Sequence, residues 1–175
     1  WGMINDPSEF ERYCAITVRA LDALLDYQAY PVKAAEVSTM ARRPLGVGII
    51  NLAYFLAKRG LRYDDAALEV IDEYTEAWSY YLIKASADLA AEFGTISKVM
   101  ETKYGHGITP NQTYKKEVDQ LVANVERMDW ESLRAQLKET GIRNSTLMAL
   151  MPAETSAQIS NSTNGIEPPR ALVSY

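Results

Sequence analysis

The chain has 175 residues, of which 47% are hydrophobic and 23% are charged, and its formal net charge is −5. This length and composition suit one domain with a core of its own, while the negative charge argues against a general nucleic-acid binder. No apolar run approaches the roughly 18–20 residues of a membrane helix, and the single cysteine excludes an internal disulfide framework, so we expect a cytoplasmic protein that binds neither nucleic acid nor membrane.

Both ends of the chain look unfinished. It opens with Trp1 rather than Met, and it closes on RALVSY, a strand-like run with no stop signal after it. We therefore expect residues 1–175 to form a single partial domain, either a piece of a larger protein or one part of a split one.

Helical spacing dominates the first part of the chain. Asp6 and Pro7 are residue types that begin a helix and Pro31 is one that ends it, so we expect a helix between them. A short, β-branched and glycine-punctuated run follows at residues 45–50, which is typical of a buried strand. This strand is expected to lead directly into a helix that ends near Gly60.

The longest predicted helix occupies residues 64–93, and Gly94 is expected to end it. Large apolar side chains recur in it every three or four residues and form one stripe, which indicates a helix with one buried face. The aromatic members of this stripe are Tyr74, Trp78 and Tyr81.

Two shorter helices are predicted after a glycine- and proline-rich loop, at Tyr114–Val125 and at Asp129–Thr140, and Gly141 is expected to stop the second. The run NSTLMALM, residues 144–151, has the character of a second buried strand. Strands flanked by packed helices predict a helix-rich α/β fold.

The junction after the second predicted strand is the most distinctive candidate site, because residues 144–175 hold only three charged side chains and are dense in Ser, Thr, Asn and Gln. Where a strand ends and a helix begins, free backbone N–H groups and the positive end of the helix dipole suit a phosphate, and hydroxyls add further donors. A purely structural alternative stays open, since Thr155-x-x-Gln158 also matches a capping box. The candidate ligands are Pro152, Ala153, Glu154, Thr155 and Ser156.

Two other motifs favour structural interpretations. The pair Gly46-x-Gly48 has Asn51 where a dinucleotide fingerprint needs its third glycine, so we interpret the glycines as allowing close packing at a strand end. Cys14 lies among apolar helix positions, far in sequence from the single histidine, and is expected to be a small buried apolar residue.

The charged and metal-binding residue types offer little further chemistry. His106 has no Cys or His neighbour that would complete a metal site, so no metal ligands are predicted. Arg42 and Arg43 are interpreted as a solvated pair before the first strand. Asp64 and Asp65 are interpreted as a helix start.

Long, compositionally unusual segments resemble one known family. The run RNSTLMALMPAETSAQISNSTNGIEPPRALVS is similar to the catalytic (large) subunit of class I ribonucleotide reductase, the ribonucleoside-diphosphate reductase. The segments VRALDALLDYQAYP, RRPLGVGIINLAYFLAKRG and YYLIKASADLA resemble the same family in the same order. The resemblance therefore extends from about residue 8 to residue 175.

The resemblance implies a ten-stranded α/β barrel of which this chain supplies a late portion. In that family, the residues matching Pro152, Ala153, Glu154, Thr155 and Ser156 hold the diphosphate of a ribonucleoside diphosphate substrate. Many relatives carry a hydroxyl at the position of Ala153, so backbone N–H groups and the two remaining hydroxyls are expected to do more here. The polar run 158–164 is expected to shape the neighbouring barrel wall.

The resemblance also implies that the redox chemistry lies outside this chain. The family reduces ribonucleotides to deoxyribonucleotides with cysteines that match no residue here, so no catalytic residue is expected in the chain, which alone should be inactive. It binds no cofactor itself. The complete enzyme is implied to be a dimer that needs the remaining large-subunit segments, a metal-containing, radical-generating small subunit, a thioredoxin- or glutaredoxin-type reductant, and ATP and dNTP effectors.

Two alternative functions for the chain stay open beside that of a reductase fragment. The chain could be a non-enzymatic nucleotide- or phosphate-binding module that keeps the helix start at residues 152–156. It could also be a helical interaction module that uses the stripe of Tyr74, Trp78 and Tyr81; exposure of that stripe would favour such a module, and burial would dismiss it.

Overall fold

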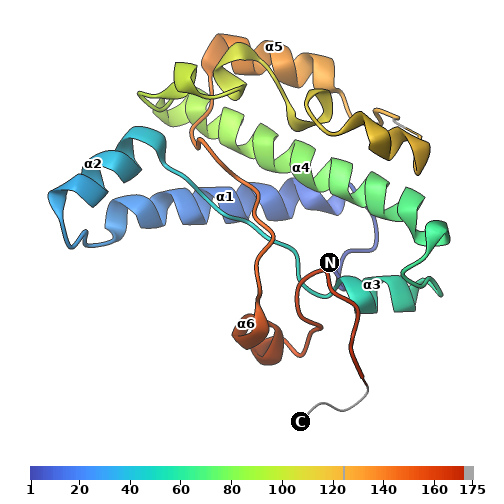
Figure 1. Ribbon diagram of the computed structural model, residues 1–175. Coiled ribbons are helices and arrows are strands. Elements are labelled where there is room, and N and C mark those ends of the chain that lie inside the picture. The colour runs from blue at the N-terminus through green and yellow to red at the C-terminus, as the bar shows by residue number, and fades with distance from the viewer. Residues whose placement is uncertain (124, 172–175) are drawn as a thin grey trace.

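The regular structure of the chain is helical (Figure 1). The computed structural model describes residues 1–123 and 125–171. The α-helices of these residues are α1 (Glu9–Tyr27), α2 (Lys33–Arg42), α3 (Leu52–Lys58), α4 (Asp65–Phe93), α5 (Trp130–Thr140) and α6 (Glu154–Ile159). Short 3-10 helices lie between α4 and α5, at Val99–Glu101, Tyr104–His106, Pro110–Gln112 and Lys116–Gln120. None of the described helices is long and apolar enough to span a membrane.

Helices α1 and α4 lie side by side and run in the same direction. The ring of Phe10, near the start of α1, is 6.2 Å from that of Tyr74, and the Cys14 thiol one turn later points at the Trp78 carbonyl oxygen, 3.9 Å away. Because the apolar side chains of α1 recur at helical spacing, they form one buried face against α4.

Helix α4 is covered on a second side by α5 (Figure 1). The rings of Tyr80 and Trp130 meet edge-to-face with their centroids 5.2 Å apart. Trp130, Leu133 and Leu137 are almost fully buried in this contact. Helix α4 thus packs on both neighbours, which explains why its buried residues are not confined to a single narrow stripe.

Two extended segments, residues 45–50 and 144–151, lie alongside each other. Val47 donates its N–H to the Leu147 carbonyl (2.7 Å), and Ala149 donates to the Val47 carbonyl (3.0 Å), which makes a parallel bridge between Val47 and Met148. Gly48 permits this approach, because a Cβ there would lie 2.8 Å from the Ala149 carbonyl oxygen. The interpretation of these glycines as close-packing residues is confirmed.

The predicted strands are only partly confirmed. Both segments are extended and paired, but within residues 1–123 and 125–171 the bridge is isolated and forms no regular strand, so the partial ten-stranded barrel is not confirmed. Two paired segments without further neighbours form a marginal ladder, since a stable sheet needs three or more strands or extensive packing.

Several helix predictions need correction. Helix α1 begins two residues later than expected, because the Asp6 carboxylate accepts from the N–H and hydroxyl of Ser8 in a turn before it. Helix α2 was not predicted. The helix expected at Tyr114–Val125 is wrong: a 3-10 helix, Lys116–Gln120, with no buried residue stands there, so no packed face supports an α-helix.

Other boundaries are confirmed. Asp64 precedes α4 and Gly94 ends it, as the sequence indicates. Asp129 caps α5 by accepting the Ser132 N–H at 3.1 Å, and Gly141 ends that helix with a positive φ of 73°, which favours glycine. Residue 124, within the mispredicted helix, and residues 172–175, in the strand-like end, lie outside the described residues.

Candidate functional site at the end of the paired segments

The first turn of α6 carries unpaired hydrogen-bond donors. Ala153 is the N-cap, and its carbonyl accepts the Ala157 N–H at 2.8 Å. Among the described residues, no acceptor lies within hydrogen-bonding distance of the backbone N–H groups of Glu154, Thr155 and Ser156, and the hydroxyls of the last two have no partner either. Three amides and two exposed hydroxyls are therefore available to a ligand.

The predicted capping box is not present. Thr155 lies inside the first turn of α6 and not at its N-cap, where Ala153 has no side chain that can accept a hydrogen bond. The alternative interpretation of this stretch as a capping box therefore has no support, and the Thr155 hydroxyl stays free.

Open space lies in front of these donors. Pro152, Ala153, Glu154, Thr155 and Ser156 together line a shallow hollow of about 360 Å³. A neighbouring hollow of about 350 Å³ shares Pro152 and Glu154 and extends to Asn164 and Arg170. The predicted site residues thus line one open hollow.

Two asparagines connect this loop to the rest of the chain. Asn164 accepts the Ala153 N–H on its side-chain oxygen at 2.8 Å. Asn51 donates its backbone N–H to the Thr163 carbonyl (2.9 Å), and its side-chain oxygen accepts the Thr163 N–H (3.0 Å). In the sequence, Asn51 was only a mismatch to a glycine fingerprint. Its partner Thr163 is 112 residues away, so no local pattern could predict the contact.

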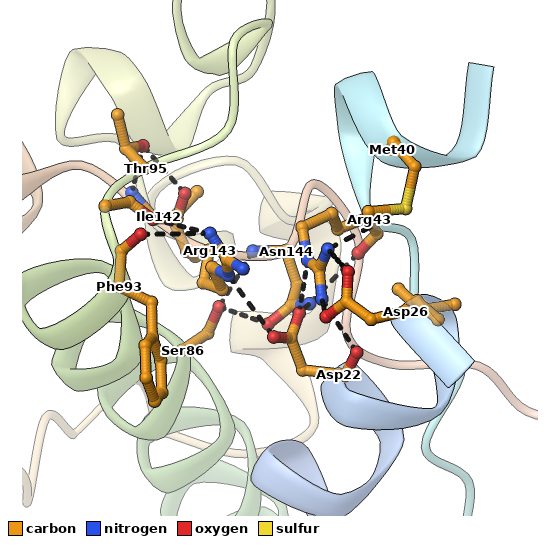
Figure 2. A network of polar contacts seen from close by, with 12 residues as sticks. Asp22, Asp26, Met40, Arg43, Ser86, Phe93, Thr95, Ile142, Arg143 and Asn144 are labelled. Atoms are coloured by element: carbon orange, nitrogen blue, oxygen red, sulfur yellow. Dashed lines mark hydrogen bonds and ion pairs between the residues drawn. The ribbon is translucent and has the colours of Figure 1, made fainter. Parts of the chain in front are cut away.

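A buried polar network lies at the opposite end of the paired segments (Figure 2). Arg43, immediately before the first segment, has a left-handed backbone (φ 43°) and is 3% exposed. Its guanidinium donates to the Asp22 carboxylate and to Asp26, each at 2.7 Å. The prediction that Arg42 and Arg43 form a solvated pair is therefore wrong for Arg43, whereas Arg42 is half-exposed and pairs with Glu101.

Asn144, the first residue of the second segment, completes the network. Its side-chain N–H₂ donates to Asp22 (2.9 Å) and to the Arg43 carbonyl (3.1 Å), while its side-chain oxygen accepts the Ser86 hydroxyl (2.7 Å). Arg143 adds a third donor to Asp22 at 3.2 Å. Both polar ends of the Asn144 side chain are paired, so this cluster holds structure together and leaves neither for a ligand.

Burial and hydrogen bonding act in opposite directions on Asp22. Burial by itself raises the pKa of a carboxyl group, but the hydrogen bonds from Arg43, Asn144 and Arg143 favour the ionised form and leave the pKa of Asp22 below its usual value. Asp22 is therefore charged at neutral pH and balances the buried Arg43 guanidinium.

The thiol and imidazole groups take no part in the candidate site. Cys14 is 4% exposed, and burial raises its pKa to about 12, so it stays a protonated thiol, as predicted. His106 is exposed on a 3-10 helix, with Nε2 3.1 Å from the Met100 carbonyl oxygen. The described part of the chain brings together no group of three or more residues that could hold a metal ion.

The aromatic stripe of α4 and the hollow beside this helix are two further features of the structure. Tyr74 and Trp78 are each 6% exposed, and Tyr81 is half-buried, so the predicted interaction stripe belongs to the core. A hollow of about 290 Å³ between α4 and residues 110–126 has an acidic rim. Those acids already have partners in Arg127, Tyr114 and Arg134.

The chain was compared with known proteins. A family model described as the ribonucleotide reductase barrel domain matches residues 3–175. Ribonucleoside-diphosphate reductase subunit alpha of Haemophilus influenzae is 55% identical over 99% of this chain, and subunit alpha of the Escherichia coli reductase 1 is 54% identical over 86%. The enterobacteria phage T4 subunit alpha is 48% identical over 97%. The chain spans 20–23% of the length of these three relatives.

Proposed function

Because the chain belongs to the family of the ribonucleotide reductase barrel domain, we propose that it supplies the substrate-diphosphate-binding loop and part of the barrel wall of a ribonucleoside-diphosphate reductase. In the complete enzyme this portion serves the reduction of ribonucleotides to deoxyribonucleotides, the precursors of DNA. The observation that carries the proposal is the set of free donors at Glu154, Thr155 and Ser156, which open onto a hollow directly after a paired extended segment.

The chemistry of these donors suits a diphosphate. Backbone N–H groups at a helix start point toward an anion, and the helix dipole favours negative charge there. The hydroxyls of Thr155 and Ser156 donate two further hydrogen bonds. Such neutral donors avoid the desolvation cost that several buried lysines would carry inside a barrel. Ala153 contributes no hydroxyl, so the amides and the other two side chains bind the phosphates.

The position of the loop also supports this proposal. In the complete subunit, residues 45–50 and 144–151 are neighbouring parallel strands of the ten-stranded barrel, to which the missing segments add the other strands. Asn51 and Pro152 follow these two segments at the same edge. Barrels and open sheets of α/β proteins place their ligands at the carboxyl ends of the strands, which is where this loop lies.

The redox step belongs to other parts of the enzyme. A thiol whose pKa is raised to about 12 by burial cannot serve as a thiolate reductant at neutral pH, so Cys14 has no such role. The catalytic cysteines come from the remaining large-subunit segments. A radical-generating, metal-containing small subunit starts the reaction, a thioredoxin- or glutaredoxin-type protein re-reduces the site, ATP and dNTP effectors regulate it, and the complete large subunit is a dimer.

The test removes the two hydroxyls in the complete alpha subunit. In Thr155→Val with Ser156→Ala, two hydrogen bonds to charged phosphate oxygens are lost, so we expect KM for a ribonucleoside diphosphate to rise about 10- to 100-fold. Ser162→Ala is the matched control, because its hydroxyl donates only a long bond (3.3 Å) to the Ser160 carbonyl. An unchanged KM in the double variant would remove the diphosphate site.

A second experiment tests whether activity requires the remaining large-subunit segments. The chain alone is expected to form no deoxynucleotide, whereas the chain mixed with the remaining large-subunit segments, the small subunit and a reductant should form it. Turnover by the isolated chain, or none by a correctly assembled mixture, would contradict the proposal.

A further inference from the structure

The loop of residues 152–156 has no capping side chain of its own, since Ala153 occupies the N-cap. Asn164 holds this N-cap residue itself from eleven residues away: its side-chain oxygen accepts the Ala153 N–H at 2.8 Å. This contact pairs the Ala153 N–H and leaves the N–H groups of residues 154–156 free.

Asn164 is itself held in place through its neighbour Thr163. Asn51 and Thr163 exchange two hydrogen bonds, one between backbone groups (2.9 Å) and one from the Thr163 N–H to the Asn51 side chain (3.0 Å). Asn51 follows the first extended segment and is the N-cap residue of α3, so it joins that segment to a helix. The contacts therefore run from the end of one segment, through Thr163 and Asn164, to the loop that follows the other.

The backbone of Asn51 explains the choice of this residue type. Its φ is 70°, in the left-handed region. Glycine adopts this region most readily, and asparagine is among the other residues that adopt it most often. Glycine would fit the backbone but would provide no acceptor for Thr163. Asparagine satisfies both requirements, which accounts for Asn51 at a position where a glycine fingerprint would place a third glycine.

We propose that Asn51 and Asn164 are positioning residues that hold the start of α6 in its substrate-binding geometry. This inference rests on the proposed function, because it assigns the pair to the diphosphate loop. A loop already fixed in the bound geometry loses less conformational freedom when the diphosphate binds, so the pair acts on substrate affinity. The proposal gives both side chains contacts with the protein only, so kcat at saturating substrate should depend little on them.

The direct test uses Asn164→Ala in the complete alpha subunit. Loss of the acceptor frees the Ala153 N–H, so hydrogen exchange of that amide in the absence of substrate should accelerate about tenfold or more. The KM for a ribonucleoside diphosphate should rise about tenfold, with kcat changed less than about twofold. Asn161→Gly is the control, because Asn161 is exposed, has a φ of 51° that glycine adopts readily, and lies in the same connection.

A second pair of variants addresses Asn51. Asn51→Gly keeps the left-handed backbone but removes the side-chain acceptor, and it should raise both the Ala153 exchange rate and KM. Asn51→Asp keeps an acceptor oxygen for the Thr163 N–H and should restore both values toward those of the unmodified protein. Failure of the aspartate to restore them would overturn the role given to Asn51.

The outcomes separate this inference from the proposed function. Unchanged Ala153 exchange in Asn164→Ala, or faster exchange with an unchanged KM, overturns the positioning role. If the Thr155 and Ser156 hydroxyl variant raises KM while Asn164→Ala does not, the diphosphate site stands and only the positioning role falls. If neither variant changes KM, the diphosphate site itself is wrong and the inference falls with it.

Discussion

At the beginning of the paired segments, Asp22, Arg43 and Asn144 satisfy one another's hydrogen bonds in a buried cluster; at their end, Glu154, Thr155 and Ser156 leave their donors open to solvent. Both regions are polar, and each adjoins one end of the same two segments. The difference is in what the polar groups face. A buried polar group must be paired within the protein, so an unpaired group persists at low cost only where water or a ligand can reach it.

Paired polar groups stabilise the fold at one end of the segments, and the proposed binding site lies at the other. Variants at the beginning of the segments should unfold the protein, and variants at the end should weaken substrate binding while the fold stays intact. The following changes test that division, from the largest expected effect on stability to the smallest.

Asp22→Ala should destabilise the chain most. The substitution removes a carboxylate that accepts from Arg43, Asn144 and Arg143, and it leaves the buried guanidinium with Asp26 as its remaining charged partner. We expect a loss of about 3–5 kcal/mol in the free energy of unfolding, measured by urea denaturation. Lys84→Met is the control: it breaks the Lys84–Asp88 pair at the surface and should cost less than about 0.5 kcal/mol.

The same carboxylate makes the fold sensitive to acid. Because the pKa of Asp22 is lowered in the folded state, its ionised form stabilises the protein above the pKa of an unfolded aspartate, about 3.9, and this contribution is lost as the pH falls through the lowered folded value. Asp26 shifts in the same direction, through its hydrogen bond from Arg43. Stability should therefore decline below about pH 4, and Asp22→Asn should flatten that decline. An equal acid dependence in both proteins would contradict this assignment.

Gly48→Ala should have an intermediate effect. A Cβ at this position would lie 2.8 Å from the Ala149 carbonyl oxygen, which is backbone and cannot move aside without separating the two segments. We expect a loss of about 1–3 kcal/mol in unfolding free energy. Gly46→Ala, whose Cβ would meet the Ala149 side chain at 3.3 Å, should cost less and serves as the matched control. Equal effects at the two glycines would show that close approach at Gly48 is not required.

The Thr155→Val with Ser156→Ala variant should have the smallest effect on the fold. Both side chains are exposed, and among the described residues their hydroxyls have no partner, so the free energy of unfolding should change by less than about 0.5 kcal/mol. The increase in KM expected for this variant would then reflect binding alone. A large loss of stability would show instead that the hydroxyls serve the fold.

The local elements of the fold were predictable because their signals are local. The apolar spacing of α4, the Asp129 cap and the Gly141 stop each depend on residues within a few positions of one another. The junction at residues 152–156 was found in the same way, from a strand-like run followed by small polar residues. The family resemblance extended these predictions to substrate and partners.

Other predictions failed because a local pattern did not decide the structure. Residues 114–125 have helical spacing, but the 3-10 helix there buries no residue, and without a packed face the spacing has no stabilising effect. Thr155 matches a capping box, but α6 begins one residue before it. The local sequence predicts a solvated Arg43, but in the folded chain Asp22 and Asn144 form hydrogen bonds with it.

The sequence by itself thus determined where most of the helices lie, where the second extended segment meets the donor-rich loop, and which family the chain resembles. Only the tertiary structure decided that Arg43 is buried, that Asn51 reaches Thr163, and that Asn164 holds Ala153. The physical reason is the range of the interactions. Helix spacing and caps act within one or two turns, whereas burial and hydrogen-bond pairing depend on residues that the folded chain brings together from 11 to 122 positions apart.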